Sequence, residues 1–312
     1  METINQGVSI STPPVSFIAK HKGLLPMAAL LTAVLLWGAS FAAMRIAVKA
    51  LSPWTVMWIR MATALVLILP FTGKLMPSDY RKGDWMLLIP MVLFQPCLYF
   101  LLESYALTFT TSSQAGVISA SVPLMVALGA WLILSEPLTR YSLAGLGISI
   151  TGVVFLTLIE GPSDKAQNPL LGNSLEFIAM ACAAINMVIV KKMSLRYSPW
   201  TLTAMQVLAG TLFFLPGLPL LLETDTSVWT FDLIAAMVFL GAFVTLGAFG
   251  FYNWGMSRIP ASKASVYINL VPVNAVLIGW IVLGEALSQG QLIAGAGVIC
   301  GVWLSQRGEK QR

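Results

Sequence analysis

The stretch SSQAGVISASVPLMVALGAWLILSEPLTRYSLAGLGISITGVVF at residues 112–155 recurs 149 residues later, without a gap, as ASKASVYINLVPVNAVLIGWIVLGEALSQGQLIAGAGVICGVWL at residues 261–304. Fourteen of the 44 aligned positions are identical. Shared hydrophobicity gives some matches by chance, but it does not place proline, tryptophan and glutamate at one common offset, as in Pro123/Pro272, Trp131/Trp280 and Glu136/Glu285. A second correspondence, shifted by 146 residues, pairs Ser52–Thr55 with Ser198–Thr201, both SPWT. The sequence therefore contains two copies of one unit.

The composition places this duplicated unit in a lipid bilayer. Of 312 residues, 57% are hydrophobic and 10% are charged, and the mean hydropathy is +0.83. Soluble domains carry about a quarter charged residues, so the composition excludes an ordinary soluble enzyme, a disordered protein and a nucleic-acid binder. A spanning helix needs about 20 apolar residues, and strands of a membrane barrel are shorter and alternate in polarity. We predict an all-α integral membrane protein with ten spans near residues 24–44, 54–72, 85–106, 113–134, 142–159, 172–190, 199–222, 231–256, 263–283 and 289–305.

Ten spans give five to each copy, so the second copy must enter the membrane from the opposite face. The predicted organisation is a five-helix repeat at 24–160, a connector at 161–171 and a second five-helix repeat at 172–305, flanked by tails at 1–23 and 306–312. Inverted repeats of this kind are typical of secondary carriers, in which two similar bundles rock around a site near the bilayer midplane.

The basic residues predict the orientation. If the N-terminus is cytoplasmic, 14 of the 18 lysines and arginines lie on the inner side, Arg45, Lys49 and Lys165 lie outside, and Arg60 lies within the second span. Because basic residues favour cytoplasmic loops, we expect both termini in the cytoplasm of a bacterial-type inner membrane. The net charge of +5 is then a topology signal, with lipid rather than nucleic acid as partner.

Several motifs resemble those of one transporter family. The first copy carries Tyr105–Leu107 (YAL), Ser112–Ala115 (SSQA), Pro123 and Leu134–Leu138 (LSEPL), and the second repeats them as Trp254–Met256 (WGM), Ala261–Ala264 (ASKA), Pro272 and Leu283–Leu287 (LGEAL). With WGASF at 37–41, these stretches look like the EamA-type branch of the drug/metabolite transporter superfamily, over about residues 28–305. The resemblance implies export of amino acids, other metabolites or drugs. The second copy has Ala183 and Asn186 where the first has Trp37 and Ser40, so the two halves of the cavity need not be alike.

Polar groups within the spans are the first candidates for a transport site, since hydrocarbon tolerates them only at a cavity or beside a partner. We predict that Arg60 is a cationic anchor for a substrate carboxylate and that its repeat mate Gln206 supplies an amide donor from the opposite side of the cavity. Alternatively, Arg60 extends its charge to the membrane interface or pairs with an internal carboxylate. Glu103 is a candidate for that partner and for proton coupling, unless it is simply hydrated near its helix end. For Glu176 we expect hydration at the outer end of its span.

The remaining substrate-binding candidates are the aromatic and neutral polar residues of the spans, namely Trp37, Ser40, Gln95, Tyr99, Ser119, Asn186, Tyr252, Tyr267, Asn269 and Asn274. Aromatic residues in membrane bundles more often serve packing or the interfacial belt. Pro123 and Pro272 each remove one backbone hydrogen bond at mid-membrane. They predict a pair of hinges, or else ordinary kinks.

Two further features suggest structural roles. Glu136 and Glu285 fall at predicted helix ends, where a carboxylate is hydrated and can cap the following helix. The glycines near 145–152 and 295–301 allow close helix packing, within one chain or, alternatively, across a homodimer. Cys97, Cys182 and Cys300 lie far apart within spans and suggest packing rather than disulfides or a metal site.

Other function classes fare less well. The single histidine is His21, near the N-terminus, all five aspartates fall in connectors, and no phosphate-binding loop is present. We therefore expect no enzyme, cofactor or bound metal. A pore-forming channel for small solutes remains the alternative to a secondary exporter of a small metabolite.

Overall fold

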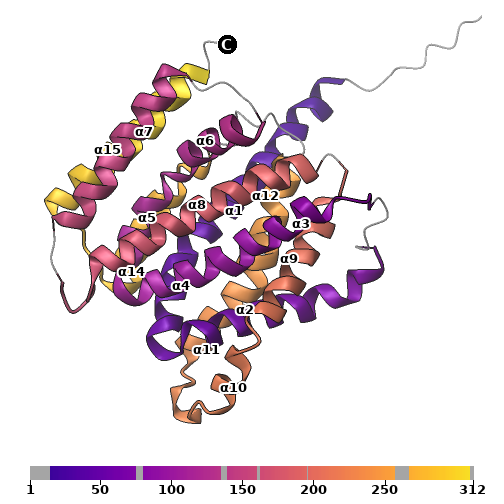
Figure 1. Ribbon diagram of the computed structural model, residues 1–312, viewed down its shortest axis with the longest axis vertical. Helices are drawn as coiled ribbons and strands as arrows, with labels where there is room; N and C mark the ends of the chain where they lie inside the picture. Colours follow the sequence, from indigo (N-terminus) through magenta and orange to yellow (C-terminus); the bar gives the residue numbers. More distant parts are fainter. Residues whose placement is uncertain are drawn as a thin grey trace, which may run out of the picture.

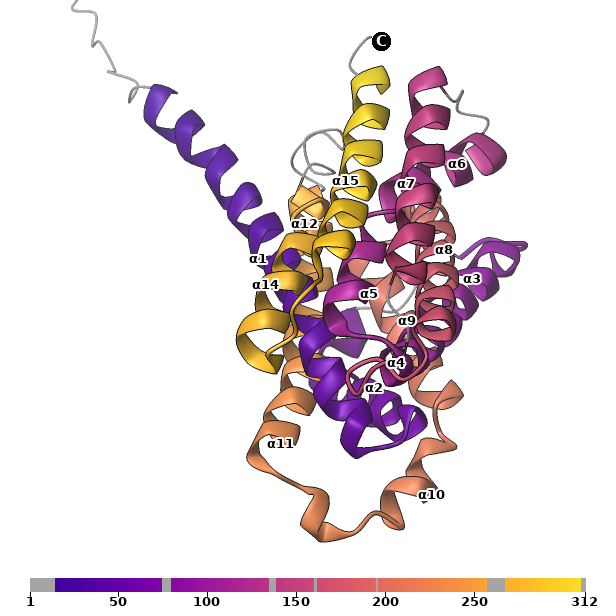
Figure 2. The ribbon, with the colours of Figure 1, turned by 90° about the vertical axis from the view of Figure 1, so that its left-hand side faces the viewer.

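The computed structural model describes residues 15–74, 80–134, 139–159, 162–194, 196–256 and 267–309, and across these ranges the chain forms helices and no β-strand. Figures 1 and 2 show the helices gathered in one bundle, from which the start of α1 projects. In chain order the helical elements are α1 (Val15–Ala50), α2 (Pro53–Ile68), η1 (Leu69–Lys74), α3 (Trp85–Val92), η2 (Leu93–Leu98), α4 (Tyr99–Phe109), α5 (Ser112–Ser119), α6 (Val122–Leu134), α7 (Arg140–Leu158), α8 (Pro169–Met193), α9 (Pro199–Phe213), α10 (Gly217–Leu222), η3 (Thr226–Val228), α11 (Phe231–Val238), η4 (Phe239–Ala248), α12 (Phe249–Met256), α14 (Val271–Leu283) and α15 (Gln289–Glu309).

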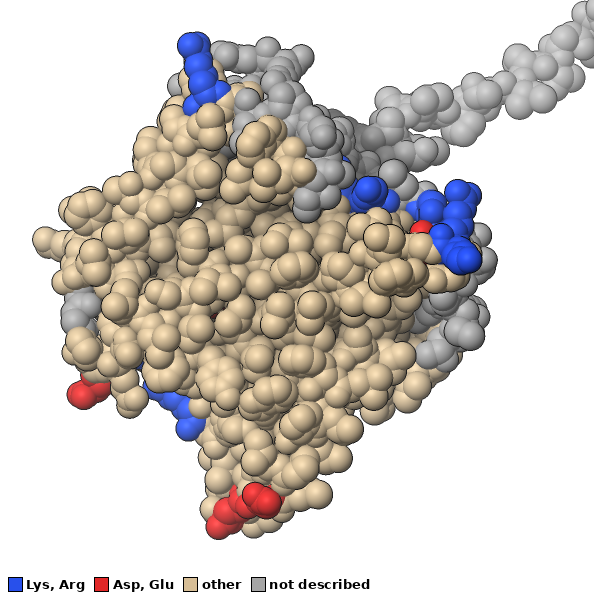
Figure 3. Space-filling view, in the orientation of Figure 1, with Lys and Arg blue, Asp and Glu red and all other residues tan. Residues whose placement is uncertain are grey.

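The predicted all-helical membrane class is confirmed. Seven helical stretches of the described chain are long and apolar enough to cross a membrane, at Leu25–Ala50, Pro53–Phe71, Trp85–Phe109, Ser112–Gly129, Arg140–Leu158, Pro169–Met193 and Phe231–Tyr252. Two shorter apolar helices follow at Val271–Leu283 and Gln289–Leu304. In Figure 3 the charged side chains of the visible face lie toward its margins, on either side of a broad uncharged band. The molecule is a multi-pass membrane protein.

The first helix is longer than the predicted span of 24–44. It starts at Val15, within the segment expected to be a tail, passes through Pro26 and continues to Ala50. No proline or glycine occurs between residue 44 and Pro53, and the residue preceding a proline disfavours helix. Arg45, expected in an outer connector, therefore lies within α1 and is buried, 4% exposed. Its guanidinium donates to the carbonyls of Leu107 and Lys165. The Leu107 carbonyl belongs to the last turn of α4, where carbonyls lack helical partners and a cation is favourable.

The predicted proline breaks are present. At Gln95 the backbone leaves the helical region, with φ −148° and ψ 122°. The fourth predicted span is divided at Ala120–Ser121, so Pro123 becomes the second residue of α6, and Pro272 likewise becomes the second residue of α14. Proline is tolerated in a first helical turn because its missing N–H would be unpaired there in any case. Whether these breaks move as hinges stays a prediction.

Two glycine-rich helices, α7 from the middle of the sequence and α15 from its C-terminal part, pack closely. Figure 2 shows α7 and α15 side by side. A Cβ at Gly301 would lie 2.5 Å from the carbonyl oxygen of Gly145, and one at Gly152 would lie 2.9 Å from that of Ala294. These glycines therefore serve packing within the chain, whereas a Cβ at Gly147 or Gly297 would meet nothing within 4 Å. A homodimer through this pair stays a prediction.

Candidate functional site

A central cavity lies among the long helices. Its volume is about 80 Å³, room for roughly five to eight water-sized groups at about 10–15 Å³ each. The wall is largely apolar, and its polar members, contributed by α1, α2, the α3–α4 region and α5, are Ser40, Arg60, Gln95, Tyr99, Glu103 and Ser119. The cavity suits a small solute that is held by a few polar groups.

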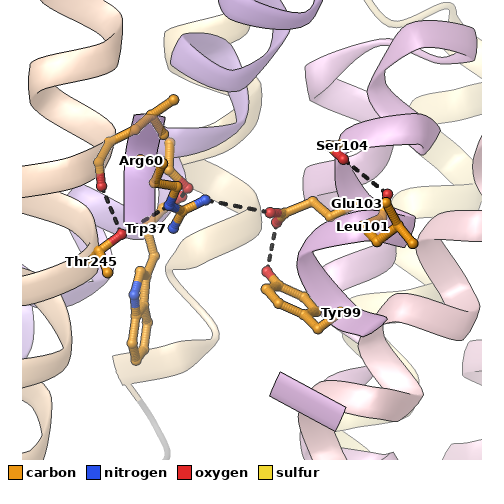
Figure 4. A network of polar contacts seen from close by, with 9 residues as sticks. Trp37, Arg60, Tyr99, Leu101, Glu103, Ser104 and Thr245 are labelled. Atoms are coloured by element: carbon orange, nitrogen blue, oxygen red, sulfur yellow. Dashed lines mark hydrogen bonds and ion pairs between the residues drawn. The ribbon is translucent and has the colours of Figure 1, made fainter. Parts of the chain in front are cut away.

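Arg60 is the cation of this wall and is almost completely buried, 2% exposed. Its Nε donates to the Thr245 hydroxyl at 2.9 Å, and Thr245 in turn donates to the Leu240 carbonyl of the π-helix η4. The guanidinium lies 4.0 Å from the ring centroid of Phe100, within cation–π range. The arginine is thus anchored on one side of the cavity (Figure 4).

Glu103 faces Arg60 from α4. A Glu103 carboxylate oxygen lies 3.9 Å from Arg60 Nη1, and Tyr99 donates its hydroxyl to the other carboxylate oxygen at 2.5 Å. Glu103 is 4% exposed, so the expectation of a hydrated carboxylate near the helix end is wrong, whereas the alternative of an internal partner for Arg60 is confirmed. At 3.9 Å the two charges attract without a hydrogen bond of normal length.

The helix break at Gln95 positions two predicted site residues. Asn186 donates its side-chain N–H to the carbonyls of Met91 and Gln95, at 2.7 and 3.4 Å, and Gln206 donates to the Gln95 carbonyl at 2.9 Å. Both amides thus satisfy carbonyls that the broken helix leaves without helical partners. Asn186 does not line the cavity, and Gln206 lines a smaller adjoining pocket that shares Gln95, Phe100 and Phe249 with it.

The aromatic candidates divide between the wall and the packing behind it. Trp37 and Tyr99 line the cavity. Tyr252 lies behind Trp37, with ring centroids 4.8 Å apart, and Tyr267 packs against the main hydrophobic core. Trp37 and its repeat mate Ala183 both line the cavity, so the wall is bulky on one side and small on the other.

The asparagines beside Pro272 lie outside the cavity wall. Asn274 packs against α1, where a Cβ at Gly38 would lie 2.4 Å from the Asn274 Cβ. The Asn269 carbonyl oxygen and the Asn274 side-chain nitrogen are buried and have no hydrogen-bond partner among the described residues. Neither residue lines the cavity that contains the substrate candidate Arg60 and the proton-coupling candidate Glu103.

Glu176 of α8 differs most from expectation. It is fully buried at 0% exposure, so the prediction of a hydrated carboxylate is wrong. Neither carboxylate oxygen has a hydrogen-bond partner in the described part of the chain. The predicted span began at residue 172, which put Glu176 near its outer end, whereas α8 begins at Pro169 and carries Glu176 deeper.

Glu285 also differs from expectation, because it is buried and caps a helix of the other half. Its carboxylate accepts from the backbone N–H groups of Ser112 and Ser113 at 3.1 and 2.9 Å and from both serine hydroxyls. Lys165 donates its Nζ to the neighbouring Gly284 carbonyl. The carboxylate thus satisfies the first amides of α5, a helix N-terminus that favours negative charge. Its repeat mate Glu136 lies outside the described residues.

The structure shows the surroundings of the three cysteines and of possible metal ligands. Cys97 and Cys182 are buried, Cys300 is exposed, and all three are free thiols. Within the described ranges, no three His, Cys, Asp or Glu side chains come together as a metal site would require.

Comparison with known proteins identifies the family. The model of the EamA-like transporter family matches residues 24–158 and, a second time, residues 170–306. The chain belongs to the EamA-like transporter family. Of the EamA motifs, WGASF contributes Trp37 and Ser40 to the cavity wall, and SSQA at 112–115 begins the helix that Glu285 caps.

Individual relatives match most of the chain. It is 26% identical to the uncharacterized transporter YetK of Bacillus subtilis over 80% of this chain and 76% of YetK. It is 28% identical to protein PagO of Salmonella typhimurium, covering 87% and 89%. It is 24% identical to a probable terminal-alkyne amino-acid exporter of Streptantibioticus cattleyicolor, covering 89% and 92%. A crystal structure 18% identical in sequence superposes with a TM-score of 0.58 over 89% of this chain and 94% of that one, which is a likeness of fold.

Proposed function

We propose that this EamA-like transporter is a secondary carrier that exports small zwitterionic metabolites, such as amino acids, across the inner membrane. The observation that carries the proposal is the Arg60–Glu103 pair, two buried opposite charges 3.9 Å apart in the wall of the cavity. An α-amino acid presents the complementary arrangement, because its carboxylate suits Arg60 and its ammonium suits Glu103.

The surroundings of the pair favour such an exchange of partners. Thr245 fixes the Arg60 guanidinium through Nε, and Tyr99 fixes the Glu103 carboxylate. Both charges therefore keep their positions when a solute enters between them, and each gains a charge-assisted hydrogen bond that the 3.9 Å contact lacks. In a site shielded from water such bonds are stronger than at a surface.

The proposed mechanism is alternating access between two inverted five-helix repeats, at 24–160 and 172–305, with ten spans and both termini in the cytoplasm. The internal sequence repeat, the two family matches and the paired helix starts at Pro123 and Pro272 support this arrangement. The contact of Glu285 with Ser112 and Ser113 supports a conformation that is closed on the predicted outer side.

One relative supports the substrate class. The protein of Streptantibioticus cattleyicolor, 24% identical, is named a probable amino-acid exporter. A cavity with room for roughly five to eight water-sized groups suits a small amino acid better than a large drug.

The test is transport in proteoliposomes that contain the purified protein. Labelled L-alanine, L-threonine, L-leucine and L-phenylalanine are offered over a wide concentration range, with and without unlabelled amino acid inside. A carrier gives saturable uptake and stimulation by internal substrate for at least one of them. Linear flux without counterflow would favour a channel, and no flux of any of the four would reject the substrate class.

A further inference from the structure

Glu176 is a fully buried carboxyl group that the proposed site does not use. Both its oxygens are without a hydrogen-bond partner among the described residues, and the side chain is 0% exposed. An ionised carboxylate deprived of water, of hydrogen bonds and of a cation is too costly to persist in a protein interior. In this conformation Glu176 is therefore the neutral acid.

Glu176 lies on the cavity side of α8. Met180, Ala183 and Met187 line the cavity from this helix, and Glu176 precedes Met180 by one helical turn on the same face. Glu176 is seven residues from the start of α8, Arg60 is seven from the start of α2, and Glu103 is six from the end of α4. At 1.5 Å per residue, all three lie roughly 10 Å from the same predicted outer end of their helices.

The charges near Glu176 do not balance if it is ionised. The titratable groups that act on it are Glu103 and Tyr99, both on α4, and Arg60 is the cation that acts on Glu103. The other helices that pack against α8 are α3, η2, α5, α6 and α7, whose charged member is Arg140 at the opposite, inner end of α7. One arginine therefore serves two carboxyl groups, and a proton on Glu176 restores neutrality.

A cluster of polar side chains lies between Glu176 and the predicted outer side. Asn173 lies one turn before Glu176 on α8, donates to Gln114 at 3.0 Å and to Thr157 at 3.2 Å, and accepts from Thr110 at 2.6 Å. Asn173 and Thr110 are buried, and Thr110 immediately follows the last residue of α4. These groups form a buried polar cluster outward of Glu176, to which Glu176 itself is not hydrogen-bonded in this conformation.

We propose that Glu176 is the proton-binding site of the carrier and that one proton is exchanged for one substrate molecule in each cycle. The inference rests on the proposed function. When the cavity opens to the cytoplasm, the substrate ammonium binds at Glu103, and its positive charge favours the ionised carboxylate of Glu176 on the neighbouring helix α8, so the Glu176 O–H bond breaks and its proton passes to cytoplasmic water. When the cavity opens outward, the substrate leaves and a proton from the outer solution re-forms the acid. Net movement is one proton inward for one zwitterion outward.

The transport test uses proteoliposomes with an acidic interior and a neutral exterior. Wild type accumulates the panel amino acid that exchanges fastest, because protons that leave drive its entry. Glu176→Gln loses this accumulation and keeps exchange of labelled for unlabelled amino acid, since exchange needs no net proton movement. Glu223→Gln, which changes an exposed glutamate beyond α10, behaves as wild type. Accumulation by Glu176→Gln equal to that of wild type overturns the proposal.

A second measurement reads the proton directly and needs no substrate. Infrared spectra of the purified protein at neutral pH show the carbonyl band of a protonated carboxyl group in wild type and in Glu223→Gln, and this band is lost in Glu176→Gln. Its absence from wild type overturns the proposal. The band without transport of any panel amino acid rejects the proposed substrate class and leaves the protonation of Glu176 established.

A third variant separates protonation from folding. Glu176→Met replaces an unpaired buried carboxyl group by an apolar side chain of similar length, so its melting temperature equals or exceeds that of wild type. A marked loss of stability in Glu176→Met would show that the carboxyl group is a structural element and would overturn the proposal.

Discussion

The carboxylate of Glu285 lies against the first turn of α5, where it accepts hydrogen bonds from the amide and the hydroxyl of Ser113, a residue 172 positions earlier in the chain. The contact joins the second copy of the repeat to the first. Because it combines a negative charge with a helix N-terminus, it is stronger than a contact between neutral groups.

We predict that Glu285→Gln weakens this contact between the two copies of the repeat. The amide retains one acceptor oxygen but loses the charge, at an expected cost of about 1–2 kcal/mol. The measurement is labelling of Ala115→Cys, a position with 0% exposure, by an impermeant maleimide in a background without native cysteines. Labelling rises in Glu285→Gln and stays low in the control Glu223→Gln. Equal labelling in both would show that Glu285 does not hold α5.

Close packing of α5 on α14 gives a second prediction. A Cβ at Gly116 would lie 2.2 Å from the Cβ of Ala275, so Gly116→Ala forces the two helices apart. Overpacking of this kind costs about 1–3 kcal/mol, and we expect a lower melting temperature and impaired transport. The matched control is Gly147→Ala on α7, where a Cβ meets nothing within 4 Å. A Gly116→Ala variant as stable as Gly147→Ala would contradict the prediction.

The buried ion pair gives a third prediction. Arg60→Met leaves Glu103 without its cation, and removal of one partner from a buried pair typically costs about 3–5 kcal/mol. The double variant Arg60→Met/Glu103→Gln removes both charges, so much of the lost stability returns. Amino-acid transport does not return, because both proposed substrate contacts are absent.

Melting temperatures and exchange assays of the two variants check this expectation. If the double variant is stable and still exchanges amino acids at the wild-type rate, the pair has only a structural role. Arg60→Met alone should also impair transport of an amino acid more than that of its amide, which lacks the carboxylate.

A fourth prediction concerns pH and the inner surface. The Tyr197 hydroxyl donates to the Asp84 carboxylate at 2.6 Å, and the Arg81 amide donates to it at 2.9 Å. These hydrogen bonds, together with Arg196, hold the pKa of Asp84 below its ordinary value of 3.8. A carboxylate with a lowered pKa stabilises the fold above its unfolded pKa, and the stabilisation is lost as the pH falls through the folded value.

Asp84→Asn should therefore lower the melting temperature at neutral pH, and its difference from wild type should shrink below pH 3.8. The control is Asp164→Asn, an exposed residue in the connector before α8. A difference that stays constant from neutral to acid pH would contradict the role of the charge.

The sequence predicts the helices better than their interior contacts. Long apolar runs determine where spans lie, and Pro123 and Pro272 mark helix starts because proline cannot continue a hydrogen-bond ladder. The predicted end of the first span, at residue 44, is wrong because Arg45 lies inside the bundle, where it donates to backbone carbonyls. A charged residue at this position in a sequence normally indicates a loop. The carbonyl partners of Arg45 come from distant residues and leave no local signal.

For the candidate site too, the sequence predicts individual residues better than their contacts. Residue type and depth identified Arg60 and suggested Glu103 as its partner, and the structure places them together. The rule that carboxylates near helix ends are hydrated failed for Glu103, Glu176 and Glu285, all buried. Asn186 and Gln206 were predicted to bind substrate, but their side-chain amides instead donate hydrogen bonds to backbone carbonyls at the helix break around Gln95. The apolar part of the wall, such as Met180 and Phe249, cannot be distinguished by sequence from ordinary core.

The glycine contacts between α7 and α15 have a consequence for measurements of motion. At Gly301 the two backbones meet without intervening side chains, so there are no rotamers whose rearrangement would let one helix slide along the other. The pair therefore supplies a fixed contact between the two repeats, about which their remaining helices move. Spin or fluorescent labels at the outward positions Gly147 and Gly297 would keep a fixed separation throughout the cycle, and displacements of every other helix can be measured against them.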